Sequence, residues 1–425
     1  MHVAIITAGG AGMFCGSCMH DNTWARALLA AGVEVTLVPT YTPIRVDEPN
    51  QSESHVYFGG LNVYLGSRVP GWSHLPRWAT RWLDRPGLIR WATRFSVSNE
   101  AAELGRLTLD MLAGEAGPHR AAGEELARHI AEELRPDVVI FSNALLVGAL
   151  RTLRAAYPGP ILCTLQGDDL FLDGLPDSSR EAALQAISER SRQFTGFLAH
   201  SRFYQEYMTE YLLLNAPKFH QLPLSIDPEG HDGRPGERNE SPFTVGYFAR
   251  IAPEKGLHHL VDAFRLLAEQ RSDVRLRIGG YLGSQNHDYF ESVQRGLAGL
   301  ETLYEYVGSP GSHEEKVRFY RGLDVLSVPT EFQEPKGLYV LEALANGVPV
   351  VQPAHGAFPE LIEATGGGLL TTPRDARALA AALVRLHDDR ELRLTLGTNG
   401  QDAIRKKFSL PALAEATLRA IEGCG

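Results

Sequence analysis

The sequence predicts an α/β protein of two domains, each built on a parallel sheet, and two observations support this fold class. Short apolar runs alternate with helical patterns along the whole chain, as is typical of strand-helix-strand units stacked around parallel sheets. A polar stretch rich in proline and glycine, at residues 227–242, interrupts the alternation. Because the alternation resumes after this stretch, we expect two sheets and place the domain boundary there.

The expected strands are short and apolar, and turns rich in glycine or polar residues follow them. They cover residues 3–7, 33–39, 138–142, 161–165 and 197–200 in the first half, and 244–248, 274–278, 324–328 and 348–351 in the second. The spacing of the apolar residues in 257–267 predicts one buried helix face: Leu257, Leu260, Val261, Phe264 and Leu267. We therefore expect an N-terminal domain over 1–228 with a helical insertion at about 71–120, a second domain over 240–405, and a closing segment over 406–425 with a helix at 411–421.

The composition is that of an ordinary globular protein, with 44% apolar and 22% charged residues among 425. The 41 basic against 51 acidic side chains give a formal charge of -10, which argues against nucleic acid as a partner. No run of 18 apolar residues occurs, so we expect no membrane-spanning helix. The first residues resemble a buried strand more than a positively charged leader, and four cysteines are too few for a disulfide scaffold. These features favour a cytoplasmic protein.

The first stretch that could carry chemistry is residues 246–257, where a strand leads into the periodic helix. Arg250 lies in the intervening loop and Lys255 near the helix N-terminus. Two cations and the positive end of a helix would converge there, which suits a phosphate or diphosphate. Taken alone, an arginine and a lysine five residues apart more often mark a solvated surface.

The second stretch is residues 329–351, which carries two glutamates. Glu334 precedes a predicted helix and Glu342 lies inside it, with Gly337 between them. Two carboxylates at this spacing are a weak signal by themselves. A preceding strand and a glycine where backbone amides could approach a ligand add weight to it.

Residues 245–363 resemble the C-terminal half of retaining glycosyltransferases with the GT-B fold, of the family 4 type. The resemblance rests on Arg250, Glu254-Lys255-Gly256, Glu334, Gly337, Glu342-Ala343, Gly347-Val348-Pro349, His355-Gly356 and Glu360. It is weaker over the N-terminal half, where the glycine loop and the order of strands match. It implies two Rossmann-like domains facing across a cleft, with the helix in 406–425 crossing back to the first domain.

The resemblance also implies roles for these residues. Arg250 and Lys255 would bind the diphosphate of a nucleotide-sugar donor, and Glu334 would accept hydroxyl groups of its sugar. Glu342 would bind the ribose hydroxyls of the donor. Backbone amides near Gly337, Leu338 and Tyr339 would face the phosphates or the sugar, and backbone groups around Gly308 would contact the base.

The implied function is transfer of a sugar from a UDP-, GDP- or ADP-sugar to an undetermined acceptor, with retained anomeric configuration and without a metal ion or cofactor. Fixed cations on the leaving diphosphate lower the barrier directly. Two alternatives stay open. One is a nucleotide-sugar epimerase of the same fold, and the other is a noncatalytic protein that binds nucleotide sugars.

The loop at residues 7–22 follows the first strand and is rich in glycine. It lacks the Gly-Lys-Ser/Thr ending of a Walker A loop and the G-x-G-x-x-G spacing. In the GT-B interpretation, Gly10 and Gly12 approach the donor and His20 contacts the acceptor or sugar. The pair Cys15-x-x-Cys18 favours packing or a role in the acceptor loop, with metal binding and redox chemistry as alternatives.

Residues 165–169 end another strand of the first half. Many family members carry a histidine where this chain has Gln166, and Gln166 could still bind a sugar hydroxyl but cannot carry a proton near neutral pH. Asp168 or Asp169 either orients an acceptor hydroxyl or caps the following helix.

A basic segment rich in tryptophan lies at residues 71–95. It contains four of the five tryptophans (Trp72, Trp78, Trp82, Trp91) and five arginines (Arg77, Arg81, Arg85, Arg90, Arg94) against one acid, Asp84. Such a segment could lie on an anionic membrane surface, which would make the protein membrane-peripheral. The alternative, which we favour slightly, is a pair of helices that pack their tryptophans inward.

Overall fold

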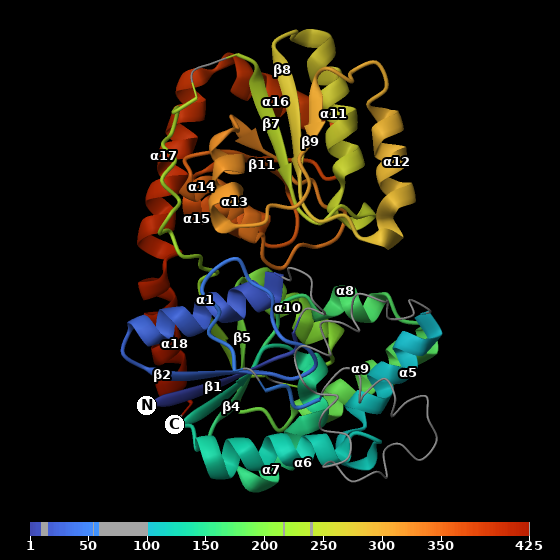
Figure 1. The fold of residues 1–425 in the computed structure, drawn as a ribbon, viewed down its shortest axis with the longest axis vertical. Helices are drawn as coiled ribbons and strands as arrows, with labels where there is room; N and C mark the ends of the chain where they lie inside the picture. Colours follow the sequence, from blue (N-terminus) through green and yellow to red (C-terminus); the bar gives the residue numbers. More distant parts are fainter. Residues whose placement is uncertain (10–15, 54, 59–100, 216, 239–240, 425) are drawn as a thin grey trace. The chain divides into compact units, whose positions relative to one another are not determined.

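The structure is a computed structural model that describes residues 1–425 except 10–15, 54, 59–100, 216, 239–240 and 425 (Figure 1). The chain divides into two units: unit 1 comprises Met1–Pro223 and Leu413–Gly425, and unit 2 comprises Leu224–Ala412. The ranges expected from the sequence were 1–228, 240–405 and 406–425. The basic segment at 71–95, Gly10, Gly12 and Cys15 lie outside the described residues.

Unit 1 is built on a parallel sheet of six strands in the order β2-β1-β3-β4-β5-β6. Its strands are β1 (His2–Thr7), β2 (Glu34–Pro39), β3 (Val138–Phe141), β4 (Ile161–Thr164), β5 (Gly196–Ala199) and β6 (Phe219–Gln221). Its helices are α1 (Gly16–Ala30), α5 (Ala101–Leu112), α6 (Arg120–Arg128), α7 (Leu150–Ala156), α8 (Asp168–Asp173), α9 (Asp177–Ser191) and α10 (Arg202–Tyr211), with shorter helical turns η4 (Gly114–Ala116), η5 (His129–Leu134) and η6 (Ala144–Ala149).

The last helix of the chain, α18 (Leu410–Glu422), packs within unit 1 from Leu413 onward. The indole Nε1 of Trp24 on α1 donates a hydrogen bond of 2.8 Å to Thr417 Oγ1 on α18. Both side chains are buried, so this bond fixes the end of the chain to the helix that follows the first strand.

Unit 2 is built on a second parallel sheet of six strands, in the order β12-β11-β10-β7-β8-β9. Its strands are β7 (Phe243–Phe248), β8 (Val274–Gly279), β9 (Tyr304–Tyr306), β10 (Val325–Leu326), β11 (Val350–Pro353) and β12 (Gly368–Thr371). Its helices are η7 (Pro253–Lys255), α11 (Leu257–Gln270), η8 (Ser284–Asn286), α12 (His287–Gly296), α13 (His313–Arg321), α14 (Leu338–Ala345), α15 (Phe358–Thr365), α16 (Ala376–Asp388) and α17 (Arg390–Lys407).

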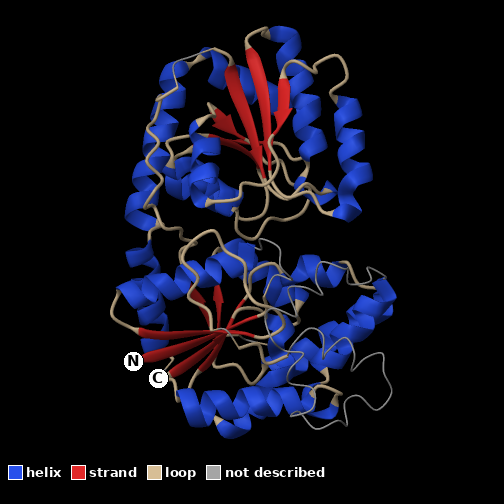
Figure 2. Ribbon diagram, in the orientation of Figure 1, coloured by secondary structure: helices blue, strands red, loops and turns tan. Residues whose placement is uncertain are grey.

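Helices cover both faces of the sheet in each unit, as the colours of Figure 2 show. This layering explains why the central strands are continuous apolar runs: β3 and β4 are buried at every residue. The predicted helix at 257–267 is confirmed as α11, whose five predicted core side chains are at most 1% exposed.

Three strands were missed in the sequence: β6, β9 and β12. All three lie at an edge of their sheet. Their residues are half-buried or exposed, so they lack the apolar run that marks the inner strands. None of the helices that the structure describes is long and apolar enough to cross a membrane.

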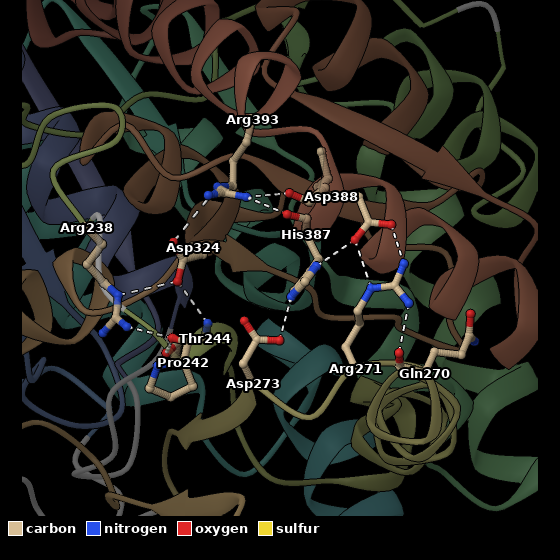
Figure 3. Close-up of polar contacts among 11 residues, drawn as sticks. Arg238, Pro242, Thr244, Gln270, Arg271, Asp273, Asp324, His387, Asp388 and Arg393 are labelled. Carbon is tan, nitrogen blue, oxygen red and sulfur yellow. Dashed lines mark hydrogen bonds and ion pairs between the residues drawn. The ribbon is translucent and has the colours of Figure 1, made fainter.

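A polar network orders the amino ends of β7 and β10 (Figure 3). The buried carboxylate of Asp324 accepts a hydrogen bond of 2.8 Å from the backbone of Thr244 and lies 3.4 Å from Arg238 Nε. Arg393 approaches the same carboxylate at 3.9 Å. This network lies at the end of the strands opposite to the candidate site described next.

Candidate functional site

The candidate site of unit 2 lies where the strand order of its sheet reverses. Strand β7 is flanked by β10 on one side and by β8 on the other, so the connections that leave β7 and β10 diverge. Ligands of open parallel sheets bind in the crevice beyond the carboxyl ends of the strands at such a switch point. The loop after β7 carries Arg250 and Lys255, and the loop after β10 carries Glu334 and Gly337.

Lys255 and Glu334 join these two loops directly. The Lys255 Nζ lies 2.7 Å from Glu334 Oε2, and the Tyr339 hydroxyl donates a hydrogen bond of 3.1 Å to the same oxygen. The ammonium also lies 4.5 Å from the ring centroid of Phe332. The side chains of Lys255 and Glu334 are 15% and 6% exposed, so the pair is largely shielded from water.

The surroundings keep Glu334 ionised. Burial alone would raise its pKa, but the charge of Lys255 and hydrogen bonds from Lys255 and Tyr339 hold that pKa below the ordinary value. The same contacts and burial raise the pKa of the Tyr339 phenol far above its ordinary value, so it stays a donor. The cluster therefore presents a fixed carboxylate whose other oxygen can accept a ligand hydroxyl.

Arg250 is held differently from Lys255. Its guanidinium lies 2.6 Å from Glu254 Oε1 and its side chain is 41% exposed, so it is accessible from solvent. The Tyr247 hydroxyl beneath it donates to the Arg250 carbonyl at 3.2 Å. Burial raises the pKa of Tyr247 well above its ordinary value; the charges of Glu254 and Glu334 add to this, and the charge of Arg250 opposes it.

Two glycines allow these loops to approach each other. Gly256 has φ +70°, and a Cβ there would lie 1.9 Å from the carbonyl oxygen of Pro329. Gly356 has φ +60°, and a Cβ there would lie 2.6 Å from the backbone nitrogen of Glu334. Glu331 also donates its backbone N–H to the Glu254 carbonyl at 2.9 Å. Gly256 and Gly356 therefore serve loop packing around Glu334.

The N-terminus of α14 lies in the same loop. Gly337 precedes the helix with φ +84°, a conformation that glycine adopts at low cost. The first backbone amides of a helix have no partner within it, so those of Leu338 and Tyr339 are available to an anion. Gly308 follows β9 with φ +75°, accepts a hydrogen bond of 2.9 Å from Gly280, and has open space where a Cβ would be.

Glu342 is buried in a cluster that the sequence did not reveal. Its two carboxylate oxygens lie 2.7 Å from Lys316 Nζ and 2.7 Å from the Tyr320 hydroxyl, both on α13. Lys316 and Tyr320 are four residues apart and so share one helix face, which is the signal that could have revealed them. The ribose contact expected of Glu342 stays a prediction; the structure shows what positions the carboxylate.

A second polar cluster lies in unit 1 at the carboxyl ends of β1, β3 and β4. The buried carboxylate of Asp21 accepts hydrogen bonds from Thr7 Oγ1 at 2.6 Å and from Gln166 Nε2 at 3.0 Å. Gln166 Nε2 also donates to the Ser142 carbonyl at 2.6 Å. Asp21 was not singled out in the sequence, although it is the centre of this cluster.

Asp168 and Asp169 do not cap the following helix, so that alternative is wrong. Gly167 is the N-cap residue of α8, and this helix start has no capping hydrogen bond from a side chain. Asp168 instead accepts from the backbone of Ala144 at 2.8 Å, and Asp169 accepts from the Tyr204 hydroxyl at 2.6 Å. Burial raises the pKa of Asp168 to about 6.

The three residues expected to touch the acceptor or sugar are all buried in unit 1. His20 is fully buried with its ring edge-on to His200, and Gln166 and Asp168 are 4% and 2% exposed. Their contact with a substrate stays a prediction. Cys18 is buried as well, at 2% exposed.

These features define a protein with two Rossmann-like units, the second of which carries two cation–carboxylate pairs at its switch point. Similar structures include a sucrose-phosphate synthase of Thermosynechococcus elongatus, with a TM-score of 0.71 and 19% identity over 99% of this chain and 98% of that one. Anabaena HepE in complex with UDP has a TM-score of 0.67 and 18% identity over 100% of both chains. At these identities the likeness shows the fold, which is GT-B.

Sequence comparison finds relatives that are similar to unit 2. Residues 232–403 match the family model described as "Glycosyl transferases group 1". The capsular polysaccharide biosynthesis glycosyltransferase CapM of Staphylococcus aureus is 30% identical over 172 residues, which are 39% of this chain and 42% of CapM. A D-inositol 3-phosphate glycosyltransferase of Corynebacterium aurimucosum is 33% identical over 174 residues, 40% of either chain. The chain thus aligns with about two-fifths of these relatives' length, and the similarity to the group 1 glycosyltransferases is confined to unit 2.

Proposed function

We propose that the chain transfers a sugar from a nucleotide-diphosphate-sugar donor to an acceptor hydroxyl, with retention of anomeric configuration. The observation that carries the proposal is the direct contact of Lys255 with Glu334 at the switch point, beside the N-terminus of α14. The match of residues 232–403 to the group 1 glycosyltransferase family model supports it. The UDP bound by HepE, a protein of the same fold, supports a nucleotide donor.

The diphosphate of the donor is assigned to the cationic side of the crevice. Lys255 and Arg250 supply two positive charges, and the first amides of α14 supply hydrogen-bond donors. At ~4 Å and an effective dielectric near 20, one such charge pair has a Coulomb energy on the order of 4 kcal/mol. These groups stabilise the negative charge that grows on the leaving diphosphate, which is where preorganised charge lowers a barrier most.

The carboxylates are assigned to hydroxyl groups of the donor. Glu334 accepts hydrogen bonds from the sugar through the oxygen that Lys255 and Tyr339 do not contact, and Glu342 accepts from the ribose. In the reaction, the bond from the anomeric carbon to the phosphate oxygen breaks with its electron pair going to the diphosphate. The acceptor oxygen forms the new bond on the same face and passes its proton to the departing phosphate.

The chemical step needs no metal ion in this proposal, because the protein's own cations neutralise the leaving group. Treatment with EDTA should therefore leave the transfer rate unchanged. The acceptor is assigned to unit 1, where His20, Gln166 and Asp168 lie near one another around Asp21. A cytoplasmic location belongs to the same proposal, and sedimentation with anionic liposomes decides between peripheral membrane contact through residues 71–95 and inward packing of their tryptophans.

The experiment that tests the function is a panel of UDP-, GDP- and ADP-sugars, read first by thermal shift. A bound donor stabilises the native chain by about 2.7 kcal/mol at a hundredfold excess over its Kd. With the donor found, Lys255→Ala and Glu334→Gln should each lower the transfer rate by about 10² to 10³. Lys406→Ala is the matched control, because Lys406 is a 72% exposed lysine of the same unit.

Three outcomes would contradict the proposal. If Lys255→Ala folds and transfers sugar at the rate of Lys406→Ala, the cation does not act on the leaving group. If the donor is converted to another free sugar without any acceptor, the chain is an epimerase instead. Donor binding with neither reaction would mean a noncatalytic binding protein.

A further inference from the structure

A cluster of two histidines and a glutamate lies next to the candidate site but takes no part in it. His258 and His259 begin helix α11, and Glu331 follows β10 in the loop that also carries Glu334. His258 Nε2 and His259 Nε2 each lie 3.0 Å from the same oxygen, Glu331 Oε1. The ligand atoms of the three residues all lie within 4.8 Å of one another.

We propose that His258, His259 and Glu331 form a binding site for a divalent transition metal ion, of which Zn²⁺ is the best match. Imidazole nitrogens and a carboxylate oxygen are ligands that zinc prefers, at about 2.0–2.2 Å. Tetrahedral ligands at this distance lie about 3.4 Å from one another. The observed separations of 3.0 Å therefore need small outward shifts of the side chains to admit the ion.

The surroundings of the cluster fit a metal site with an open position. The side chains of His258 and Glu331 are 35% and 34% exposed, and that of His259 is 17% exposed. An ion can therefore enter from solvent and keep water as a fourth ligand. The two rings are tilted by 43° with centroids 4.1 Å apart, and both Nε2 atoms face the same carboxylate oxygen.

Tyr289 supplies the outer contact that a histidine ligand usually has. Its hydroxyl lies 2.9 Å from His258 Nδ1. With a metal on Nε2, Nδ1 is the ring nitrogen that contacts this hydroxyl, and the contact orients the ligand. The same geometry without an ion is a pair of hydrogen bonds from the two histidines to one carboxylate, and the experiment below separates the two.

A metal ion here would connect the two loops of the candidate site. Helix α11 begins directly after Lys255 and Gly256, and Glu331 precedes Glu334 by three residues. An ion bound to both elements cross-links them. The site does not depend on the proposed sugar transfer, and its ion takes no part in the chemical step.

The test is calorimetric titration of Zn²⁺ into the full chain, freed of metal beforehand and without any donor. We expect one saturable site per chain and a rise of the thermal midpoint with Zn²⁺. His259→Ala should weaken binding by about tenfold or more, in line with the loss of a metal ligand or its support. His287→Ala is the matched control, because His287 is an exposed histidine of the same unit outside the cluster.

Glu331→Gln keeps a hydrogen-bond acceptor but removes the charged ligand, so it serves if His259→Ala does not fold. Its Zn²⁺ affinity should fall while its thermal midpoint without metal stays near that of the wild type. The proposal is overturned if no saturable binding occurs, or if both cluster variants bind Zn²⁺ as tightly as His287→Ala does. Because no donor is present, this result is independent of whether the proposed transfer is found.

Discussion

Replacing Lys255 by methionine removes the ammonium that lies 2.7 Å from Glu334 and keeps most of the side-chain volume. Glu334 then remains as a buried carboxylate, with the Tyr339 hydroxyl as a hydrogen-bond donor. Breaking a buried pair by removing one partner typically costs 3–5 kcal/mol, and the partial exposure of Lys255 favours the lower end, about 3 kcal/mol. For a unit of this size we expect the thermal midpoint to fall by about 6–12 °C.

The pH dependence of this loss follows from the pKa of Glu334. In the wild type that pKa lies below its ordinary value of 4.5, so Glu334 contributes stability above pH 4.5, and this contribution is lost as the pH falls through the lowered value. Without Lys255, burial raises the pKa of Glu334 above 4.5, so the variant loses stability as the pH rises from that value. The stability gap between the two proteins should therefore be wider at neutral pH than at about pH 5.

The assay is urea unfolding of the wild type, Lys255→Met, Glu334→Gln and the double variant at both pH values. If the two residues form the pair described, the double variant recovers part of the loss, with a coupling energy of about 0.5–3 kcal/mol. Additive losses and a gap that does not change with pH would refute the reasoning.

The remaining predictions concern buried groups and one glycine. Asp168 has a raised pKa of about 6 against an ordinary 3.8. The free energy of unfolding of the wild type should therefore fall by on the order of 3 kcal/mol as the pH rises between these values. Thermal unfolding of Asp168→Asn should not show this pH dependence. Lys316→Met leaves the Glu342 carboxylate buried without its cation and should cost about 3 kcal/mol in urea unfolding; an unchanged midpoint would show that the pair contributes nothing. Gly299→Ala should lower the free energy of unfolding by ~1 kcal/mol, and Gly256→Ala should lower it by well over that amount. Both glycines have positive φ, but of the two only Gly299 has space for a Cβ. Equal losses of stability would contradict this.

The sequence predicted the inner framework of both sheets because those elements depend on local pattern. Residues 257–270 form a helix whose apolar face has a period that can be read directly, and β8 lies where a strand was expected at 274–278. The edge strands β6, β9 and β12 could not be predicted in this way. Their side chains are partly exposed, and their conformation is set by pairing with a neighbouring strand instead of by their own apolar content.

The sequence predicted the site as two separate stretches, but it did not predict the contacts between them. That Lys255 meets Glu334 depends on β7 lying next to β10, and no spacing within either stretch contains that information. Lys316 and Tyr320 were overlooked because their role depends on a carboxylate from another helix. His258 and His259 read as ordinary residues of a helix start until Glu331, more than 70 residues away, is brought beside them.

The most direct test of the central claim is a crystal structure of the chain with a bound nucleoside diphosphate. The account predicts that the diphosphate oxygens lie within hydrogen-bond distance of the Lys255 ammonium and the first amides of α14, with the ribose near Glu342. A diphosphate bound elsewhere, with Lys255 still closed on Glu334, would contradict it.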